Sequence, residues 1–333
     1  MRVLVTGGAG FIGSHVVDQL LDRGHEVAVL DNLETGNRNN LPVHVPLYEQ
    51  DIQDESAVAA VFDEFAADAV CHQAAQMSVS RSVREPGYDA RVNVVGLLNV
   101  LTHAVRVGCR KFVFASSGGV LYGEATEPAG EATPAAPISP YGISKWVGEQ
   151  YLQFFVREHG VQAVSLRYSN VYGPRQNPLG EAGVVAIFCT RMLRGQTSTI
   201  NGDGRYIRDY VYVGDVARAN VTSLESVGNA GFLPLNIGTG LPTDVNELAA
   251  ILRSHCQRIW QQRGQPGDVP QPEHGPPRPG DLRSNLVSAA KAGQILGWQP
   301  EVPLEQGLRQ TVEWFETARQ RTESTSDKAI RTE

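Results

Sequence analysis

The chain has 333 residues, of which 41% are hydrophobic, 20% charged and 7% aromatic. This is an ordinary globular composition, and the length suits one large α/β unit or two lobes. The net charge of −7 opposes binding to a nucleic-acid backbone, and no apolar run approaches the ~18 residues that nominate a membrane span. We therefore expect a cytoplasmic protein that binds neither nucleic acid nor a membrane.

The first half of the chain alternates between short apolar runs and segments of helical periodicity. This alternation is typical of a parallel sheet covered on both faces. We predict a Rossmann-type, doubly wound α/β fold. Its strands are expected at 2–6, 26–30, 43–48, 68–72, 111–115 and 162–167, and its helices at 11–23, 54–65, 90–107 and 141–159.

The pattern loosens after Asn170. We expect residues 1–170 to form the main domain, to which parts of the later chain return, and 171–316 to form mainly a smaller, discontinuous lobe that binds the substrate. Residues 261–280 contain six prolines and four glycines, which indicates a connector without regular structure or a loop that closes over a ligand. Residues 317–333 are polar and are predicted to form a frayed tail.

A glycine-rich turn lies between the first strand and the first helix. Gly7, Gly8, Gly10 and Gly13 have the spacing with which a backbone approaches a pyrophosphate at a helix N-terminus. Asp31 ends the second strand, 18 residues beyond Gly13, where a carboxylate accepts both ribose hydroxyls of an adenosine and repels the 2′-phosphate of NADP.

These features predict NAD binding, with a simple turn at residue 31 as the alternative. Asp51 and Ile52 are expected at the adenine edge, unless Asp51 only caps a helix.

Tyr141 and Lys145 are four residues apart at the start of a predicted helix, so the phenol and the ammonium share one helix face. A phenol of pKa ~10 must reach ~7 to act as a base at neutral pH. One nearby cation supplies ~1–3 units, and the positive nicotinamide ring would supply the rest. A surface pair is the alternative.

Two hydroxyls follow the strand at 111–115. Ser116 and Ser117 are expected at the carboxyl end of a parallel strand, where side chains face a ligand crevice. A serine-rich turn without a catalytic role is the alternative. The widely spaced cysteines and histidines indicate no metal site.

Three motifs together resemble the extended short-chain dehydrogenase/reductase family. They are the segments 6–13, 141–145 and 166–176, and the likeness extends from residue 1 to about 315. Within that family the chain is most similar to the NAD-dependent nucleotide-sugar epimerases of the UDP-glucose 4-epimerase type. The resemblance implies an isomerase that epimerises a UDP-hexose at C4 by transient oxidation.

The resemblance also implies residue roles. Tyr141 would take the proton from the sugar 4-hydroxyl, Lys145 would hold the nicotinamide ribose and lower the phenol pKa, and Ser117 would pair with the sugar O4. In the commoner pattern the catalytic Ser or Thr lies four residues before the Tyr of a Tyr-Gly pair. Here Gly118 stands four before Tyr122, as in a Gly-Gly variant, which leaves Ser116 and Ser117 both open.

The implied ligand contacts form two sets. The expected NAD contacts are Gly7, Gly10, Phe11, Ile12, Gly13, Asp31, Asn32, Asp51, Ile52, Ala74, Ala75, Asn93, Tyr141 and Lys145. The expected UDP-sugar contacts are Ser117, Tyr141, Asn170, Val184, Ile187, Arg208, Arg278 and Asp281. The two arginines would clamp the diphosphate, and Asp281 would accept the uridine ribose or pair with Arg278.

Two asparagines bear on substrate choice. In this family the position that limits the room beside the sugar falls near Asn285, and a bulky aromatic there would exclude a 2-acetamido group; the resemblance therefore implies that N-acetylated sugars enter as well. Relatives that handle glucuronate tend to place a cation at the position of Asn177, so this asparagine favours UDP-glucose and UDP-galactose over UDP-glucuronate.

The alternatives are a UDP-glucuronate 4-epimerase, another epimerase, decarboxylase or dehydratase on the same fold, and a non-catalytic NAD sensor. A dehydratase would show an Asp-Glu pair where Gly118 and Gly119 stand.

Relatives pair two helices into a dimer seam, so a homodimer is also expected. The apolar positions in the corresponding helices here are Val94, Leu98, Val105, Val147, Tyr151 and Phe155.

Overall fold

The core of the fold is a seven-stranded parallel sheet, seen in a computed structural model that describes residues 1–125, 127–178, 183–226, 231–278 and 281–330. Its strand order is β11-β6-β5-β4-β1-β2-β3. The strands are β1 (Arg2–Thr6), β2 (Glu26–Leu30), β3 (Leu47–Tyr48), β4 (Ala69–His72), β5 (Lys111–Ser117), β6 (Gln162–Tyr168) and β11 (Phe232–Ile237). Near-continuous apolar runs such as Val3 to Val5 suit strands that are buried on both faces.

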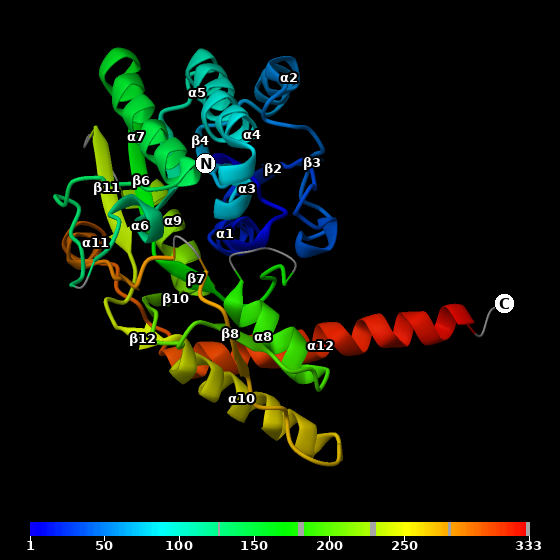
Figure 1. Ribbon diagram of the computed structural model, residues 1–333. Helices are drawn as coiled ribbons and strands as arrows, with labels where there is room; N and C mark the ends of the chain where they lie inside the picture. Colours follow the sequence, from blue (N-terminus) through cyan, green and yellow to red (C-terminus); the bar gives the residue numbers. More distant parts are fainter. Residues whose placement is uncertain (126, 179–182, 227–230, 279–280, 331–333) are drawn as a thin grey trace.

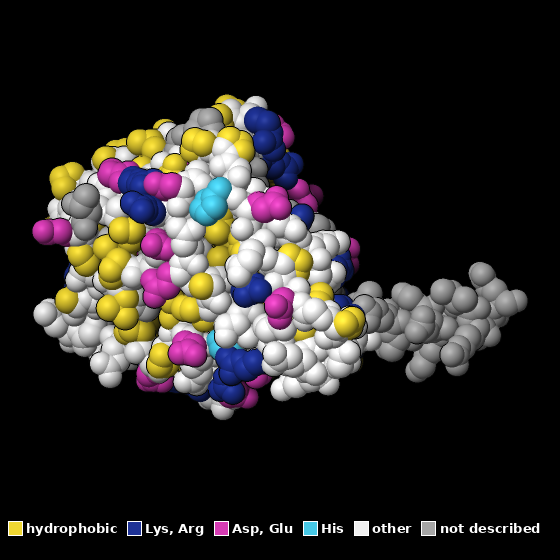
Figure 2. Space-filling model, turned by 60° about the horizontal axis from the view of Figure 1, so that its bottom comes forward, with side chains coloured by type: hydrophobic (Ala, Val, Ile, Leu, Met, Phe, Trp, Pro, Cys, Tyr) yellow, Lys and Arg dark blue, Asp and Glu magenta, His cyan; other side chains and the backbone are white. Residues whose placement is uncertain are grey.

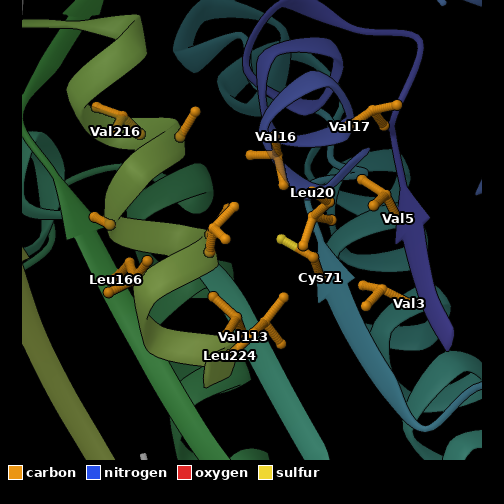
Figure 3. Packing of buried hydrophobic residues seen from close by; sticks show 14 of the residues in the cluster. Val3, Val5, Val16, Val17, Leu20, Cys71, Val113, Leu166, Val216 and Leu224 are labelled. Carbon is orange, nitrogen blue, oxygen red and sulfur yellow. The ribbon is translucent and has the colours of Figure 1, made fainter. Parts of the chain in front are cut away.

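Helices cover both faces of this sheet. One face carries α1 (Phe11–Asp22), α9 (Val213–Ser226) and α11 (Ala290–Leu296). Figure 3 shows Val16 and Leu20 of α1 and Leu224 of α9 beside strand residues such as Val113. The other face carries α2 (Glu55–Phe65), α5 (Leu97–Arg106) and α7 (Pro140–His159). The predicted doubly wound fold is confirmed.

A further hydrophobic cluster lies among α8 (Val184–Leu193), α10 (Val245–Gln262) and α12 (Leu304–Ile330), which form the lower part of the molecule in Figure 1. Short strands outside the main sheet pair with one another in the small sheets β10-β7, β12-β9-β14 and β13-β8: β7 (Asn170–Tyr172), β8 (Thr199–Asn201), β9 (Ile207–Arg208), β10 (Tyr210–Tyr212), β12 (Thr243–Asp244), β13 (Glu273–Gly275) and β14 (Ser284–Asn285). Figure 2 shows acidic and basic side chains interspersed with hydrophobic ones on the face of this lower part.

Two predicted elements differ from the structure. The strand expected at 43–48 is only β3, preceded by the 3₁₀ turn Arg38–Asn40, because Pro42 and Pro46 have no N–H to donate to a ladder. The helix expected at 90–107 is a series: α3 (Val79–Arg84) and α4 (Pro86–Ala90) lead into the π-helical stretch Arg91–Gly96 and then α5. Short α6 (Gly118–Leu121) follows β5.

The later chain is more regular than predicted. In the segment 261–280, two residues complete α10, and Glu273 to Gly275 pair in parallel with β8 because these three residues include no proline. The tail expected to fray from 317 continues α12 to Ile330. Once the packed turns of α12 have nucleated a helix, each added residue costs little. Across the described ranges, no helix is long and apolar enough to cross a membrane.

Candidate active site

The glycine turn joins β1 to α1 in a conformation that only glycine permits at two positions. Gly7 has φ +67°, and a Cβ on it would lie 2.6 Å from the backbone nitrogen of Ala74. A Cβ on Gly13 would lie 2.1 Å from the Gly7 carbonyl oxygen. Gly10 precedes α1 without a side-chain cap, and Phe11 and Ile12 open the helix. This N-terminus can therefore donate backbone N–H groups to an anion.

Asp31 is buried at the end of β2 beside this turn. Its Oδ2 accepts from Ala9 N at 2.9 Å and its Oδ1 accepts from Leu33 N at 2.9 Å. Burial raises the pKa of this carboxyl, while the two backbone donors oppose the rise. Each oxygen keeps a lone pair for a hydroxyl. The turn and this carboxylate together fit the phosphates and ribose of a dinucleotide.

Asn32, Asp51 and Ile52 lie along the same edge. Asn32 Nδ2 donates to Asp51 Oδ2 at 2.9 Å, and Asp51 Oδ1 also accepts from Gln53 N. Asp51 is not the helix cap considered above, because Asp54 caps α2 by accepting from Ala57 N. Ile52 is buried against Gly96, which makes an apolar wall.

The segment after β4 faces the glycine turn. Ala74 donates its N–H to Thr6 Oγ1 at 3.3 Å, and Ala75 beside it is half-buried. Asn93 is buried in the π-helical stretch, where its amide bonds to the backbone of Gln76, to Asp89 and to Ser144. These hydrogen bonds of Asn93 therefore fix the position of the segment that follows β4.

Tyr141 is the second residue of α7, which begins at Pro140, and Ser139 Oγ caps the helix by accepting from Gly142 N at 3.2 Å. The Tyr141 N–H donates to Ser82 Oγ of α3 at 3.1 Å. Burial raises the phenol pKa to about 12, the Asp89 carboxylate adds to the rise, and a hydrogen bond with Ser117 opposes it.

Lys145 is buried one turn further along α7. Its Nζ donates to the Ala115 carbonyl oxygen at 2.9 Å and lies 5.8 Å from the centre of the Tyr141 ring. Burial lowers the lysine pKa to about 8, and Asp89 opposes the decrease. We expected Lys145 to lower the pKa of the Tyr141 phenol. In the chain alone this pKa is set mainly by burial, with smaller effects from Asp89 and Ser117.

The structure separates the two strand-end serines. Ser116 is buried and donates to Glu149 Oε1 at 2.7 Å, whereas Ser117 shares a hydrogen bond with Tyr141. Neighbouring residues of a strand point to opposite faces. Ser117 is therefore the hydroxyl placed beside the phenol.

Sequence reasoning missed the buried ion pair beneath this site. Glu149 lies four residues after Lys145, and its Oε1 accepts from Ser116, Ser165 and Arg167 Nε. Arg167 Nη2 lies 2.6 Å from Glu149 Oε2. The repeated spacing of four residues from Tyr141 through Lys145 to Glu149 was the signal that could have identified this carboxylate.

Two of the expected substrate contacts, Asn170 and Arg208, lie in short paired strands. β7 runs parallel to β10, and Asn170 Nδ2 donates to the Asp209 carbonyl oxygen at 3.3 Å. β9 pairs with β14, which places Arg208 opposite Asn285. Asn285 is buried and donates its Nδ2 to the Gly119 carbonyl oxygen at 2.8 Å. Arg208 is thereby linked, through Asn285, to α6, which directly follows β5 and Ser117.

The remaining expected contacts are less enclosed. Val184 and Ile187 are half-buried on the first turn of α8. Arg278 and Asp281 are exposed on either side of residues 279–280, which lie outside the described residues, and the Asp281 N–H donates to the Arg278 carbonyl oxygen at 3.4 Å. Asn177 is also exposed.

The arrangement as a whole places a phenol, a hydroxyl and an ammonium at the carboxyl edge of the sheet, beside a turn shaped for phosphates. This is the edge at which open α/β sheets bind ligands. A hydroxyl or phenol there can exchange a proton with a bound alcohol.

Comparisons with known proteins give a consistent result. A family model described as the NAD dependent epimerase/dehydratase family matches residues 3–238. A putative UDP-glucose 4-epimerase of Methanocaldococcus jannaschii is 44% identical, over 94% of this chain and 98% of its own.

Two crystal structures are similar throughout. One is a UDP-glucose 4-epimerase of Thermotoga maritima with UDP-glucose, with TM-score 0.89 and 48% identity over 96% of this chain and 99% of that chain. The other is a Thermus thermophilus UDP-glucose 4-epimerase in complex with NAD, with TM-score 0.88 and 46% identity over 95% and 99%.

Proposed function

The chain belongs to the NAD dependent epimerase/dehydratase family, and from that premise we propose that it is an isomerase that epimerises UDP-glucose and UDP-galactose at C4, using bound NAD. The observation that carries the proposal is the pairing of Tyr141 with Ser117 beside Lys145, at the edge that also holds the glycine turn. The identities of 44–48% with UDP-glucose 4-epimerases support it.

The dinucleotide is proposed to lie along the carboxyl edge of the sheet. Gly7 to Gly13 hold its pyrophosphate, and Asp31 accepts its adenosine ribose hydroxyls, with Asn32, Asp51 and Ile52 at the adenine. Ala74, Ala75 and the rest of the segment that Asn93 holds in position enclose it from the other side. When bound, NAD⁺ supplies the hydride acceptor for sugar C4 and a positive ring beside the phenol.

Tyr141 is proposed as the base. Its phenolate accepts the proton of the sugar 4-hydroxyl, and the same phenol returns that proton to O4 once the opposite face of C4 has been reduced. Burial raises the pKa of this phenol to about 12 in the chain alone, so the phenol is protonated at neutral pH without the cofactor. The cationic cofactor and Lys145 must therefore stabilise the phenolate together, and Ser117 donates to O4.

The substrate is proposed to lie between the catalytic edge and the lower part. Arg208 and Arg278 bind the diphosphate with forked donors, Asn170, Val184 and Ile187 contact the nucleotide, and Asp281 accepts from the uridine ribose. Asn285 is smaller than the bulky aromatic side chain that would exclude a 2-acetamido group, so we propose that N-acetylated UDP-sugars are also accepted.

The test incubates the purified protein with UDP-glucose, UDP-N-acetylglucosamine and UDP-glucuronate separately and resolves the products by chromatography. We expect UDP-galactose from the first and the 4-epimer from the second. Turnover of UDP-glucuronate alone would favour the uronate epimerase instead. NAD binding without any epimer would favour the non-catalytic sensor.

The substitution Tyr141→Phe tests the assigned base. It removes only the phenolic oxygen, so we expect kcat to fall by about 10²- to 10⁴-fold, the usual contribution of general base catalysis. NAD binding, measured by retention through gel filtration, should persist. Turnover equal to that of the wild type would contradict the mechanism.

We also propose a homodimer that works in the cytoplasm. Apolar side chains stay exposed on α7, at Ile143, Trp146 and Phe154, and on the adjoining π-helical stretch at Val95. The six positions named from the sequence are half-buried or buried except Tyr151, so the exposed stripe is offset from them. The four free cysteines are compatible with a reducing compartment.

A further inference from the structure

A compact cluster of three side chains joins the loop after β2 to the two short helices after β4, at the carboxyl edge of the sheet. Glu34 follows β2, whereas Arg81 lies on α3 and Tyr88 on α4. Arg81 Nη1 donates to Glu34 Oε1 at 2.8 Å, and the Tyr88 hydroxyl donates to Glu34 Oε2 at 2.8 Å. The Arg81 guanidinium stacks 3.9 Å from the centre of the Tyr88 ring. We call Glu34, Arg81 and Tyr88 the clasp.

The clasp bridges the end of β1, although its three residues come from the segments that follow β2 and β4. In the sheet β1 lies between β2 and β4. The loop after β2 and the helices after β4 therefore meet across the carboxyl end of β1, where the glycine turn begins. That turn contacts the segment after β4 directly, since a Cβ on Gly7 would collide with Ala74.

Both sides of the clasp are anchored to residues already assigned to the site. On one side the Glu34 N–H donates to Asn32 Oδ1 at 3.1 Å, and Leu33 holds a left-handed φ of +57° while donating to Asp31. On the other side Ser82, next to Arg81, accepts from the Tyr141 N–H. The two sides therefore have defined positions.

The three contacts support one another. Glu34 uses both carboxylate oxygens, one for the guanidinium and one for the phenol, and the guanidinium also stacks on that phenol ring. A charged hydrogen bond and a cation–π contact that share partners are worth more than an isolated exposed ion pair. Hydrogen bonds from Arg81 and Tyr88 accordingly hold the pKa of Glu34 below its ordinary value.

We propose that the clasp closes over the bound dinucleotide at its pyrophosphate and adenosine ribose and controls how fast NAD leaves. The inference rests on the proposed use of NAD. A dinucleotide lying along the edge from Asp31 to Lys145 passes the end of β1 beneath the clasp, so release requires the Glu34 contacts to break. An epimerase that restores its cofactor in each cycle gains from such retention.

The test measures the dissociation rate of NAD. Holoenzyme loaded with radiolabelled NAD is diluted into excess unlabelled NAD, and retained label is followed by filter binding. The variants are Glu34→Gln, Arg81→Gln, Tyr88→Phe and the double variant Glu34→Gln with Arg81→Gln. The control is Asp63→Asn, which removes the exposed Arg106–Asp63 pair of 2.9 Å between α5 and α2.

We expect Glu34→Gln and Arg81→Gln each to speed NAD release about three- to tenfold, since binding differences between related proteins appear mostly in dissociation rates. The double variant should release NAD no faster than the faster single variant, because both changes break the same bridge. Asp63→Asn should match the wild type.

Three results would overturn the clasp. They are wild-type release rates in all variants, additive effects in the double variant, and faster release from Arg81→Gln with unchanged or slower release from Glu34→Gln. The last would mean that Arg81 contacts the phosphates directly. A wild-type protein that cannot be loaded with NAD would instead contradict the proposed function itself.

Discussion

At the scale of single residues, the site depends on which way neighbouring hydroxyls point. Ser116 and Ser117 are adjacent in the chain, yet one belongs to the buried Glu149 network and the other reaches the phenol of Tyr141. Chemically identical side chains therefore receive different roles from strand alternation. Burial also acts on a single residue at Lys145, where it lowers the pKa of the ammonium group.

Substitution of the two serines should separate these roles. Ser117→Ala removes the proposed donor to the sugar O4, and we expect kcat to fall about 10- to 1000-fold with little loss of stability. Ser116→Ala leaves Glu149 short of one donor, and we expect a loss of roughly 1–3 kcal/mol in unfolding free energy with kcat largely retained. Steady-state kinetics and denaturant unfolding check both. The reverse pattern would assign the catalytic hydroxyl to Ser116.

The buried ammonium predicts a pH dependence of stability in the protein without nucleotide. Burial lowers the pKa of Lys145 from 10.5 to about 8. Between these values the unfolded chain holds a proton that the folded chain has lost, so the free energy of unfolding rises with pH. The difference between 10.5 and about 8 corresponds to roughly 3 kcal/mol at ~1.4 kcal/mol for each pH unit.

Urea unfolding of the wild type and of Lys145→Met checks this dependence. Other groups titrate in both proteins and cancel in the comparison. We expect the stability of the wild type relative to Lys145→Met to increase from pH 8 to 10.5, whereas a constant difference would show that Lys145 titrates normally.

At the scale of elements, the site is made by strand and helix ends. α1 begins where the glycine turn leaves β1, and α7 begins at Ser139 with Tyr141 tied to Ser82. Both helices thus present their first turns to the same edge of the sheet. The spacing of these residues within each element explains why the sequence alone revealed them.

The glycine turn should not tolerate a methyl group at Gly13. In Gly13→Ala the added Cβ would meet the Gly7 carbonyl oxygen at 2.1 Å, and backbone atoms cannot yield as a flexible side chain does. We expect a loss of stability of roughly 1–3 kcal/mol and no retained NAD after gel filtration. Gly130→Ala is the control, because nothing lies within 4 Å of its added Cβ. Normal NAD retention by Gly13→Ala would refute the proposed phosphate contact.

At the scale of the whole molecule, one hydrophobic cluster lies on each face of the main sheet and another lies within the lower part. The short strands pair outside the main sheet and place Arg208 opposite Asn285. β11 and α9 come from late in the chain and complete the main sheet and its covering layer. The exposed apolar stripe on α7 belongs to this scale as well, because it is the surface at which we propose that a second copy of the chain binds.

The stripe predicts the assembly state. Trp146 is 40% exposed on α7, and Trp146→Glu would place a charge in the proposed seam. We expect the wild type to sediment as a dimer and this variant as a monomer. Leu241→Glu is the control, since Leu241 is 67% exposed and lies between β11 and β12 rather than on α7. A monomeric wild type, or a Trp146→Glu protein that stays dimeric, would place the interface elsewhere.

The sequence by itself determined the parallel sheet, the glycine turn with Asp31, and the Tyr141 and Lys145 pair. These features depend on short spacings and on apolar runs that the chain carries locally. The sequence mispredicted three features: the length of the strand near Pro42 and Pro46, the π-helical stretch, and the continuation of α12. The prolines shorten the strand, whereas tertiary packing and helix propagation override local composition in the two helical segments.

Only the tertiary structure decided the rest. Contacts between separate segments of the chain form the Glu149–Arg167 pair, the pairing of Arg208 with Asn285, and the clasp. Such contacts also give Ser116 and Ser117 their different partners. The proximity of these segments follows from the order and register of strands, which no local spacing encodes. Long-range pairing is chosen by the packing of the whole sheet, and so these contacts are known only when the chain is folded.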